Sequence, residues 1–230
     1  MSMCSFTLTV HLLLIQYEQE PKLELTLPSR KRKVWMKKRS KQRGVSAFKS
    51  HQSATTSPAS TLHEARTFPI LECWISEKWK GGSGLVQILL ARQQPNRKIC
   101  CGSYLIDQYC LGLKDTFAKT HVSPDRYQEL HEKMDSRQKM TTCPIELAHQ
   151  MIYASLDYAA QFGFEPQSDW TQSQYLLEPR GELEEPYQLS FGKDGKPFFI
   201  SGPYDNVEQI IKQLDKTADP GNYDVVINLS

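Results

Sequence analysis

The chain has 230 residues, with 28 Lys and Arg, 26 Asp and Glu, and 39% hydrophobic residues. These values are typical of one or two globular domains, and they exclude a collagen-like or coiled-coil protein. No apolar run approaches the ~20 residues that a membrane span needs, so we expect no membrane partner. The formal net charge of +2 averages two unlike parts, because residues 1–60 hold 11 basic and 3 acidic residues, whereas residues 61–230 hold 17 basic and 23 acidic ones.

The first part of the sequence is predicted to be a disordered basic extension and linker over residues 1–61. Residues 29–43 (SRKRKVWMKKRSKQR) repel one another and cannot form a core, and residues 44–61 are rich in Ser, Thr and Ala. Met36 opens a segment typical of a bacterial N-terminus. We therefore expect translation to start there and residues 1–35 to be an upstream extension of the reading frame. Since the basic flank and cleavage site of a signal peptide are missing, we expect a cytoplasmic protein.

The second part, residues 62–230, is predicted to be a single domain that begins with strands. Strands are expected at 68–75, 85–91 and 99–106. A Pro-Asn turn at 95–98 joins the last two into a hairpin. Such a hairpin needs helices or further strands to cover it.

Two helices are expected to supply this cover. Ser123 and Pro124 predict the N-cap and first turn of a polar helix that ends near Asp135. Pro144 predicts the first turn of a longer helix that ends at Gly163. The apolar stripe of the longer helix consists of Ile145, Ala148, Ile152, Leu156 and Ala159.

The last part of the sequence predicts a second hairpin, a helix and a final strand. Strands at 187–191 and 197–201 flank an Asp-Gly turn signal. A capping box that starts at Asp205 predicts the helix, and residues 223–229 predict the closing strand. The order β-β-β-α-α-β-β-α-β contains no repeated βαβ unit. It therefore indicates an α+β fold, with a largely antiparallel sheet built from hairpins and packed by two or three helices.

The cysteines predict no zinc site and no disulfide framework. They stand at 4, 73, 100, 101, 110 and 143, without the spacing of a zinc knuckle. Cys100 and Cys101 are neighbours on a predicted strand, so we expect them on opposite faces of the sheet. In the cytoplasm we expect all of these thiols to be reduced.

Candidate chemistry follows the second strand of the first hairpin. Asp107, Cys110, Lys114 and Asp115 lie close together there, and carboxylates such as Asp107 and Asp115 can bind a divalent metal. The same residues also fit a structural role, in which Asp107 ends the strand and Asp115 caps a short helix at 116–120. Because no third ligand has diagnostic spacing, we predict no metal and no cofactor.

A polar stripe on the longer helix offers a second candidate. His149, Tyr153 and Asp157 recur every four residues beside the apolar face. His149 is a possible general base, but a partly buried, hydrogen-bonded seam is the simpler interpretation. Cys143 lies on another face, about 9 Å from His149 along the axis, so the two cannot pair directly.

The basic run suggests nucleic-acid binding. Lys and Arg bind phosphates through counterion release without regard to sequence, and Trp35 can stack on a base. The candidate contacts are Arg30, Lys31, Arg32, Lys33, Lys37, Lys38, Arg39, Lys41 and Arg43. The predicted folded part shows no platform of aromatic and basic residues to support them.

Residues 84–117 (GLVQILLARQQPNRKICCGSYLIDQYCLGLKDTF) resemble a run shared by a family of uncharacterised bacterial proteins with a domain of unknown function. Residues 148–166 and 195–214 are similar to further segments of that family. The resemblance covers residues 36–230, agrees with a start at Met36 and implies a bacterial source. It implies no activity.

Two hypotheses of function follow. The first is a non-enzymatic binding or interaction module with a basic N-terminal arm, whose partner is a protein or a nucleic acid. The alternative is a small hydrolase or nuclease-like enzyme, with a pocket beside the hairpin of residues 84–117. Its candidate catalytic residues are Asp107, Cys110, Asp115 and His149. The sequence leaves open whether the protein is an enzyme.

Overall fold

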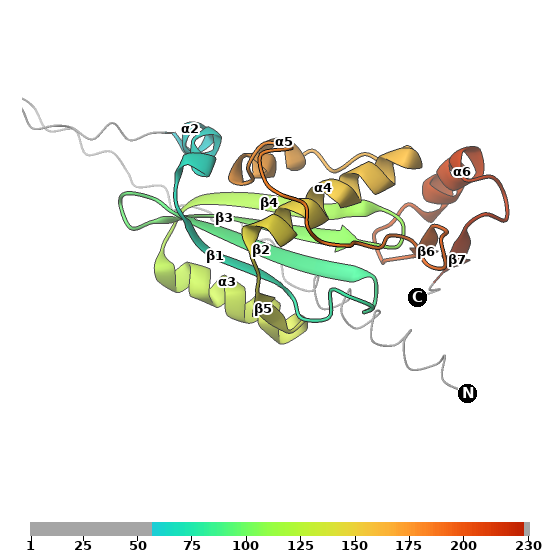
Figure 1. Ribbon diagram of the computed structural model, residues 1–230, viewed down its shortest axis with the longest axis horizontal. Helices are drawn as coiled ribbons and strands as arrows, with labels where there is room; N and C mark the ends of the chain where they lie inside the picture. Colours follow the sequence, from blue (N-terminus) through green and yellow to red (C-terminus); the bar gives the residue numbers. More distant parts are fainter. Residues whose placement is uncertain (1–56, 228–230) are drawn as a thin grey trace, which may run out of the picture.

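A five-stranded antiparallel sheet forms the centre of the computed structural model, which describes residues 57–227 (Figure 1). The strand order is β4-β3-β2-β1-β5, so β1 to β4 form a meander and β5 returns to pair with β1. The strands are β1 (Ile70–Ser76), β2 (Leu85–Gln93), β3 (Ile99–Asp107), β4 (Gly112–Val122) and β5 (Met140–Thr142). The expected α+β fold with an antiparallel sheet built from hairpins is thereby confirmed.

Helices cover both faces of this sheet. The helix α4 (Ile145–Gln161) lies on one face and α3 (Pro124–Arg137) lies on the other (Figure 1). Because both faces are covered, β2 and β3 are almost wholly buried, which explains why apolar residues point to both faces of these strands. Cys100 packs in the core on the α4 side and Cys101 in the core on the α3 side. Their expected placement on opposite faces is confirmed.

β4 replaces the short helix that was expected at 116–120, and that prediction was wrong. The edge of β3 offers backbone hydrogen-bonding groups, and β4 pairs with it along its whole length, from Gly112 to Val122. β4 carries Thr116, Phe117, Thr120 and Val122, residue types that favour a strand. Asp115 therefore lies within a strand and caps no helix.

The two covering helices begin close to the predicted positions. Ser123 is the N-cap of α3 and its hydroxyl accepts a hydrogen bond from the Arg126 amide, with Pro in the first turn, as predicted. α4 begins one residue later than expected, because Pro144 occupies the N-cap. Gly163 follows its end with a φ of +73°, a conformation that glycine adopts without strain.

The C-terminal part differs from the predicted hairpin. β6 (Phe198–Ile200) pairs in parallel with β7 (Asp224–Val226), and α6 (Val207–Thr217) connects them. Residues 187–191 form no strand, since the backbone of Tyr187 hydrogen-bonds with the Gln150 side chain on α4 instead of with another strand. The N-cap of α6 is Asn206, one residue after the predicted Asp205.

Short helical segments complete the described part of the chain. α2 (Pro58–His63) and the 3-10 helix η1 (Ala65–Thr67) precede β1, whereas α5 (Trp170–Ser173) and the 3-10 helix η2 (Gln174–Leu176) follow α4. The predicted boundary between the N-terminal linker and the folded domain lay at residue 62. α2 crosses it, so the fold includes residues from Ser57 onward. The basic run and all nine of its candidate contacts lie outside residues 57–227.

Between residues 57 and 227, no helix has both the length and the apolar character needed to cross a membrane.

Candidate functional site

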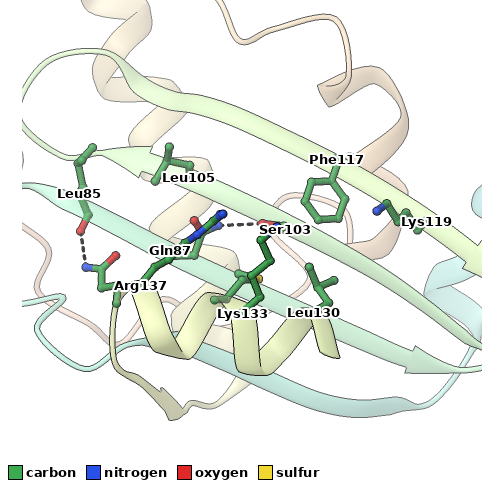
Figure 2. A pocket seen from close by; sticks show the side chains of 11 residues that line it. Leu85, Gln87, Ser103, Leu105, Phe117, Lys119, Leu130, Lys133 and Arg137 are labelled. Atoms are coloured by element: carbon green, nitrogen blue, oxygen red, sulfur yellow. Dashed lines mark hydrogen bonds between the residues drawn. The ribbon is translucent and has the colours of Figure 1, made fainter. Parts of the chain in front are cut away.

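A groove of about 310 Å³ lies between α3 and the adjacent face of β2, β3 and β4 (Figure 2). α3 joins β4 at one edge of the sheet to β5 at the other edge. Its two buried residues, Tyr127 and Met134, pack in a cluster with residues of β2 and β3. The same face of β4 is left partly open, with Phe117 half-buried and Lys119 exposed.

One side of α3 forms the wall of the groove. Leu130, Lys133, Met134 and Arg137 recur at helical spacing and line it together. Leu130 and Met134 pack against the core beneath, whereas Lys133 is exposed and Arg137 is half-buried. The wall is therefore apolar at its base and positively charged at its rim.

The floor of the groove combines apolar and fixed polar groups. Gln87 Nε2 donates to Ser103 Oγ at 2.8 Å and to the Tyr104 carbonyl at 3.1 Å. Lys119 Nζ lies 5.0 Å from the centroid of the Phe117 ring, within the range of a cation–π contact. The floor thus offers an aromatic ring, a lysine and an amide whose orientation is held.

The charge of this groove is opposite to that of the domain. Residues 57–227 hold 17 basic and 23 acidic side chains, a net charge of −6. The groove is nevertheless lined by three cationic side chains, Lys119, Lys133 and Arg137, and by no acidic one. An apolar floor with cationic groups at its edge can bind a ligand that joins a flat apolar part to an anionic part.

The predicted candidate Asp107 closes the turn between β3 and β4. Its carboxylate accepts hydrogen bonds from the backbone amides of Tyr109, Cys110 and Leu111 at 2.9, 3.2 and 3.3 Å. Burial raises the pKa of Asp107 above its ordinary value, and this outweighs the lowering by Lys114 and by the three amides. These contacts give Asp107 the structural role that was considered as the simpler alternative.

Cys110 and Asp115 lie on either side of the start of β4. Cys110 is fully buried in a small core with Phe199 and Leu214, and burial raises the pKa of its thiol far above the ordinary value. Asp115 Oδ1 accepts a hydrogen bond from the Thr116 amide. No group of three or more His, Cys, Asp or Glu side chains that could hold a metal ion occurs within residues 57–227.

His149 lies in a different environment on α4. It is fully buried, and its Nε2 donates to the Glu178 carbonyl at 2.9 Å, because a carbonyl oxygen can only accept. The Tyr153 hydroxyl donates to the same carbonyl at 3.2 Å, and Asp157 forms an ion pair with Arg180 at 2.7 Å. The predicted polar stripe is thus a seam that holds the loop after α5 against α4.

The four candidate catalytic residues therefore fall into two groups. Asp107 and Cys110 are joined in the β3–β4 turn, with Asp115 a few residues further on β4. His149 donates its hydrogen bond to the Glu178 carbonyl, in the loop that follows α5 and η2. The sequence missed the groove, although Lys133 and Arg137 stand four residues apart on α3, whose start was predicted and which ends two residues beyond the expected Asp135. Because residues 116–120 were expected to form a helix, the sequence did not place Phe117 and Lys119 on a strand beside α3, where they line the groove.

Comparisons of the chain with protein-family models, with curated proteins and with solved structures find no match.

Proposed function

We propose that this protein is a non-enzymatic binding module for single-stranded nucleic acid, and that the groove between α3 and the sheet takes one nucleotide of the strand. The observation that carries the proposal is the placement of Phe117 with Lys119, Lys133 and Arg137 around a single groove. This is the combination of aromatic and basic groups that binds single strands.

Each part of the nucleotide has a suitable contact in the groove. A base can stack on Phe117 or lie against Leu105 and Leu130, because every base has an apolar face. A neighbouring phosphate is attracted by Lys133 and by Arg137, whose planar guanidinium can form two parallel hydrogen bonds to it. A volume of about 310 Å³ is at the lower end for ligand pockets, which favours one nucleotide and excludes a duplex.

The basic run of residues 29–43 adds to this proposal. Its Lys and Arg residues would hold the phosphates of the same strand through counterion release, whatever the base sequence. A start at Met36 retains five of the nine: Lys37, Lys38, Arg39, Lys41 and Arg43. The proposal includes a cytoplasmic location, where nucleic acids are abundant. The five described cysteines are free thiols, as the reducing cytoplasm favours.

A non-enzymatic role is supported by the contacts of the candidate catalytic residues. The Asp107 carboxylate already accepts three backbone amides, and Cys110 is sealed in a core where its thiol stays protonated. Neither group is positioned to act on a ligand in the groove, because neither lines it.

The test measures binding of the full chain to a labelled 12-nucleotide single strand by fluorescence anisotropy across a salt titration. We expect the triple variant Lys119→Gln, Lys133→Gln, Arg137→Gln to weaken binding roughly 10- to 100-fold and to reduce the salt slope by up to about two. Phe117→Leu, which keeps the charge, should weaken binding roughly tenfold through lost stacking.

A matched control separates the groove from a general charge effect. Lys212→Gln with Lys216→Gln neutralises two exposed lysines of α6, outside the groove. It should change the affinity less than about threefold. An unchanged affinity in the triple variant, or an equal loss in the control, would overturn the role of the groove.

Competition distinguishes a strand from a small ligand. A nucleoside monophosphate should displace the labelled strand only at much higher concentration, since it lacks the neighbouring phosphates. If the monophosphate binds as tightly as the strand, the groove is a nucleotide site and the nucleic-acid proposal is wrong.

A further inference from the structure

Two thiols meet where β5 joins the sheet. Cys73 lies on β1, and Cys143 directly follows β5 and precedes α4. Their Sγ atoms are 3.5 Å apart, and the Cys143 amide donates to the Cys73 carbonyl at 2.9 Å. This hydrogen bond extends the β1–β5 ladder by one residue beyond the pair Trp74 and Thr142.

The backbone geometry at this position suits a disulfide bond. Residues that face each other in a hydrogen-bonded antiparallel pair have Cα atoms about 5.5 Å apart. Disulfide-bonded cysteines most often have the same separation. Bond formation therefore needs rotation of the two side chains and no movement of the strands.

We infer that Cys73 and Cys143 form a thiol–disulfide site that hydroperoxides oxidise reversibly. The inference does not depend on the proposed function, because neither thiol lines the groove.

Solvent exposure distinguishes this pair from the other described cysteines. Cys100, Cys101 and Cys110 are completely buried, whereas Cys143 is partly exposed and touches Cys73. Burial raises the pKa of Cys100 and Cys101 to about 11, which keeps both thiols protonated. An oxidant that approaches the folded domain therefore reaches Cys143 first.

Cys73 is suited to the second step. Its hydrogen bond with Cys143, together with burial, raises the pKa of Cys73 well above the ordinary value. The second step is favoured by geometry, because the Cys73 Sγ lies 3.5 Å from the Cys143 Sγ that it attacks once its thiol ionises.

The chemistry requires two steps with hydrogen peroxide as the oxidant. The Cys143 thiolate attacks the peroxide, so that an S–O bond forms, the O–O bond breaks and hydroxide leaves. The Cys73 sulfur then attacks the sulfenic acid at Cys143, an S–S bond forms, the S–O bond breaks and water leaves with the Cys73 proton. In total two thiols and one peroxide give one disulfide and two waters.

The bond would fasten the edge strand β5 to β1. α3 ends at Arg137 and the chain reaches β5 at Met140, so the same bond would fix the end of the groove wall. A cross-link between residues distant in sequence stabilises a protein mainly by restricting the unfolded chain. We therefore expect a higher melting temperature for the oxidised protein.

The test uses the full chain with Cys4→Ser, which removes the one cysteine outside the described residues. After treatment with hydrogen peroxide and blocking of free thiols, peptide mapping without reductant should show one cross-linked pair, Cys73 with Cys143. The thiols titrated after denaturation should fall from five to three, because six cysteines less Cys4 leave five. Dithiothreitol should restore all five.

Two variants in the same background serve as a matched pair. Cys143→Ser should abolish the cross-link, whereas Cys101→Ser should leave both the cross-link and its rate unchanged. The melting temperature of the oxidised and the reduced parent gives a readout that needs no further substitution. The inference is overturned if Cys73 and Cys143 stay reduced, if Cys143 proceeds to sulfinic acid without pairing, or if Cys110 reacts at the same rate.

Discussion

The two faces of the central sheet are covered by helices of opposite character. α4, on one face, buries ten of its residues between the sheet and the loops that follow α5, whereas α3, on the other face, buries two. The apolar helix closes its face, while the polar helix leaves a groove beside β4. The comparison shows that one sheet can be fully covered on one side and left partly open beside an edge strand on the other.

Polar side chains behave differently on the two faces. On the α4 side, Arg92 is 2% exposed and donates to the carbonyls of Arg66, Phe68 and Leu176 and to the Glu178 carboxylate. On the α3 side, Lys119 is exposed at the rim of the groove. The Arg92 guanidinium thus makes four hydrogen bonds inside the fold, whereas the Lys119 ammonium remains accessible to solvent beside the groove.

The largest effect is expected from Arg92→Met, which tests the sealed face. The variant leaves three carbonyls and the Glu178 carboxylate without their donor, which should cost about 3–5 kcal/mol of unfolding free energy. Denaturant titration of the parent and the variant measures this loss of unfolding free energy. A cost below about 1 kcal/mol would contradict the role of Arg92 as the connection between η1, η2 and β2.

A pair of alanine variants compares the two helices directly. Ile152 on α4 is fully buried, so Ile152→Ala should cost about 2–5 kcal/mol. Leu130 on α3 is half-buried beside the groove, so Leu130→Ala should cost about 1 kcal/mol. Equal costs in the same denaturant titrations would mean that α3 seals its face as tightly as α4 does.

The pH dependence of stability tests the desolvated carboxyl of Asp107. Burial raises the pKa of Asp107 in the folded protein, so over the range up to that pKa the folded state binds more protons than the unfolded state. The contribution of Asp107 to stability is then greatest below the ordinary pKa of a carboxyl group, and it is lost as the pH rises through the pKa that Asp107 has in the folded protein.

We therefore expect the unfolding free energy of the parent minus that of Asp107→Asn to fall as the pH rises above the ordinary carboxyl pKa of about 4. Parallel titrations at several pH values measure this slope. A difference that rises with pH would show that the three amide hydrogen bonds outweigh burial and that the pKa is lowered.

The smallest effect is expected on the outer side of α3. Arg126 and Glu129 form an ion pair at 2.8 Å, but their side chains are 76% and 61% exposed. Arg126→Gln should change the unfolding free energy by less than about 0.5 kcal/mol. A larger loss would show that α3 depends on its solvent-facing side as well as on its packing.

Local signals explain which elements the sequence predicted. The apolar stripe of α4 and the Ser-Pro start of α3 act within one helix, and both predictions were confirmed within a residue. The first hairpin followed from its apolar strands and its turn. The prediction that Asp107 ends its strand also follows from local sequence, and β3 does end there, with the Asp107 carboxylate bonded to amides among the next four residues.

The errors arose where distant parts of the chain decide the outcome. Tyr187, Leu189 and Phe191 alternate as in a strand, but they pack against the core on the α4 side while the Tyr187 backbone pairs with Gln150. β4 forms because β3 offers a free edge, which no local pattern reveals. The groove depends on how far α3 extends over β4, and this is set by where β5 returns to the sheet.

The short strand β5 has a consequence for the behaviour of the protein in concentrated solution. Its three residues pair with Trp74, Ile75 and Ser76 on the outer edge of β1. If β5 detaches, that edge presents unpaired amides and carbonyls, which are a template for pairing with a second chain. Aggregation would then begin at an intact sheet rather than from the unfolded chain, and its rate would follow the attachment of β5 more closely than the stability of the core.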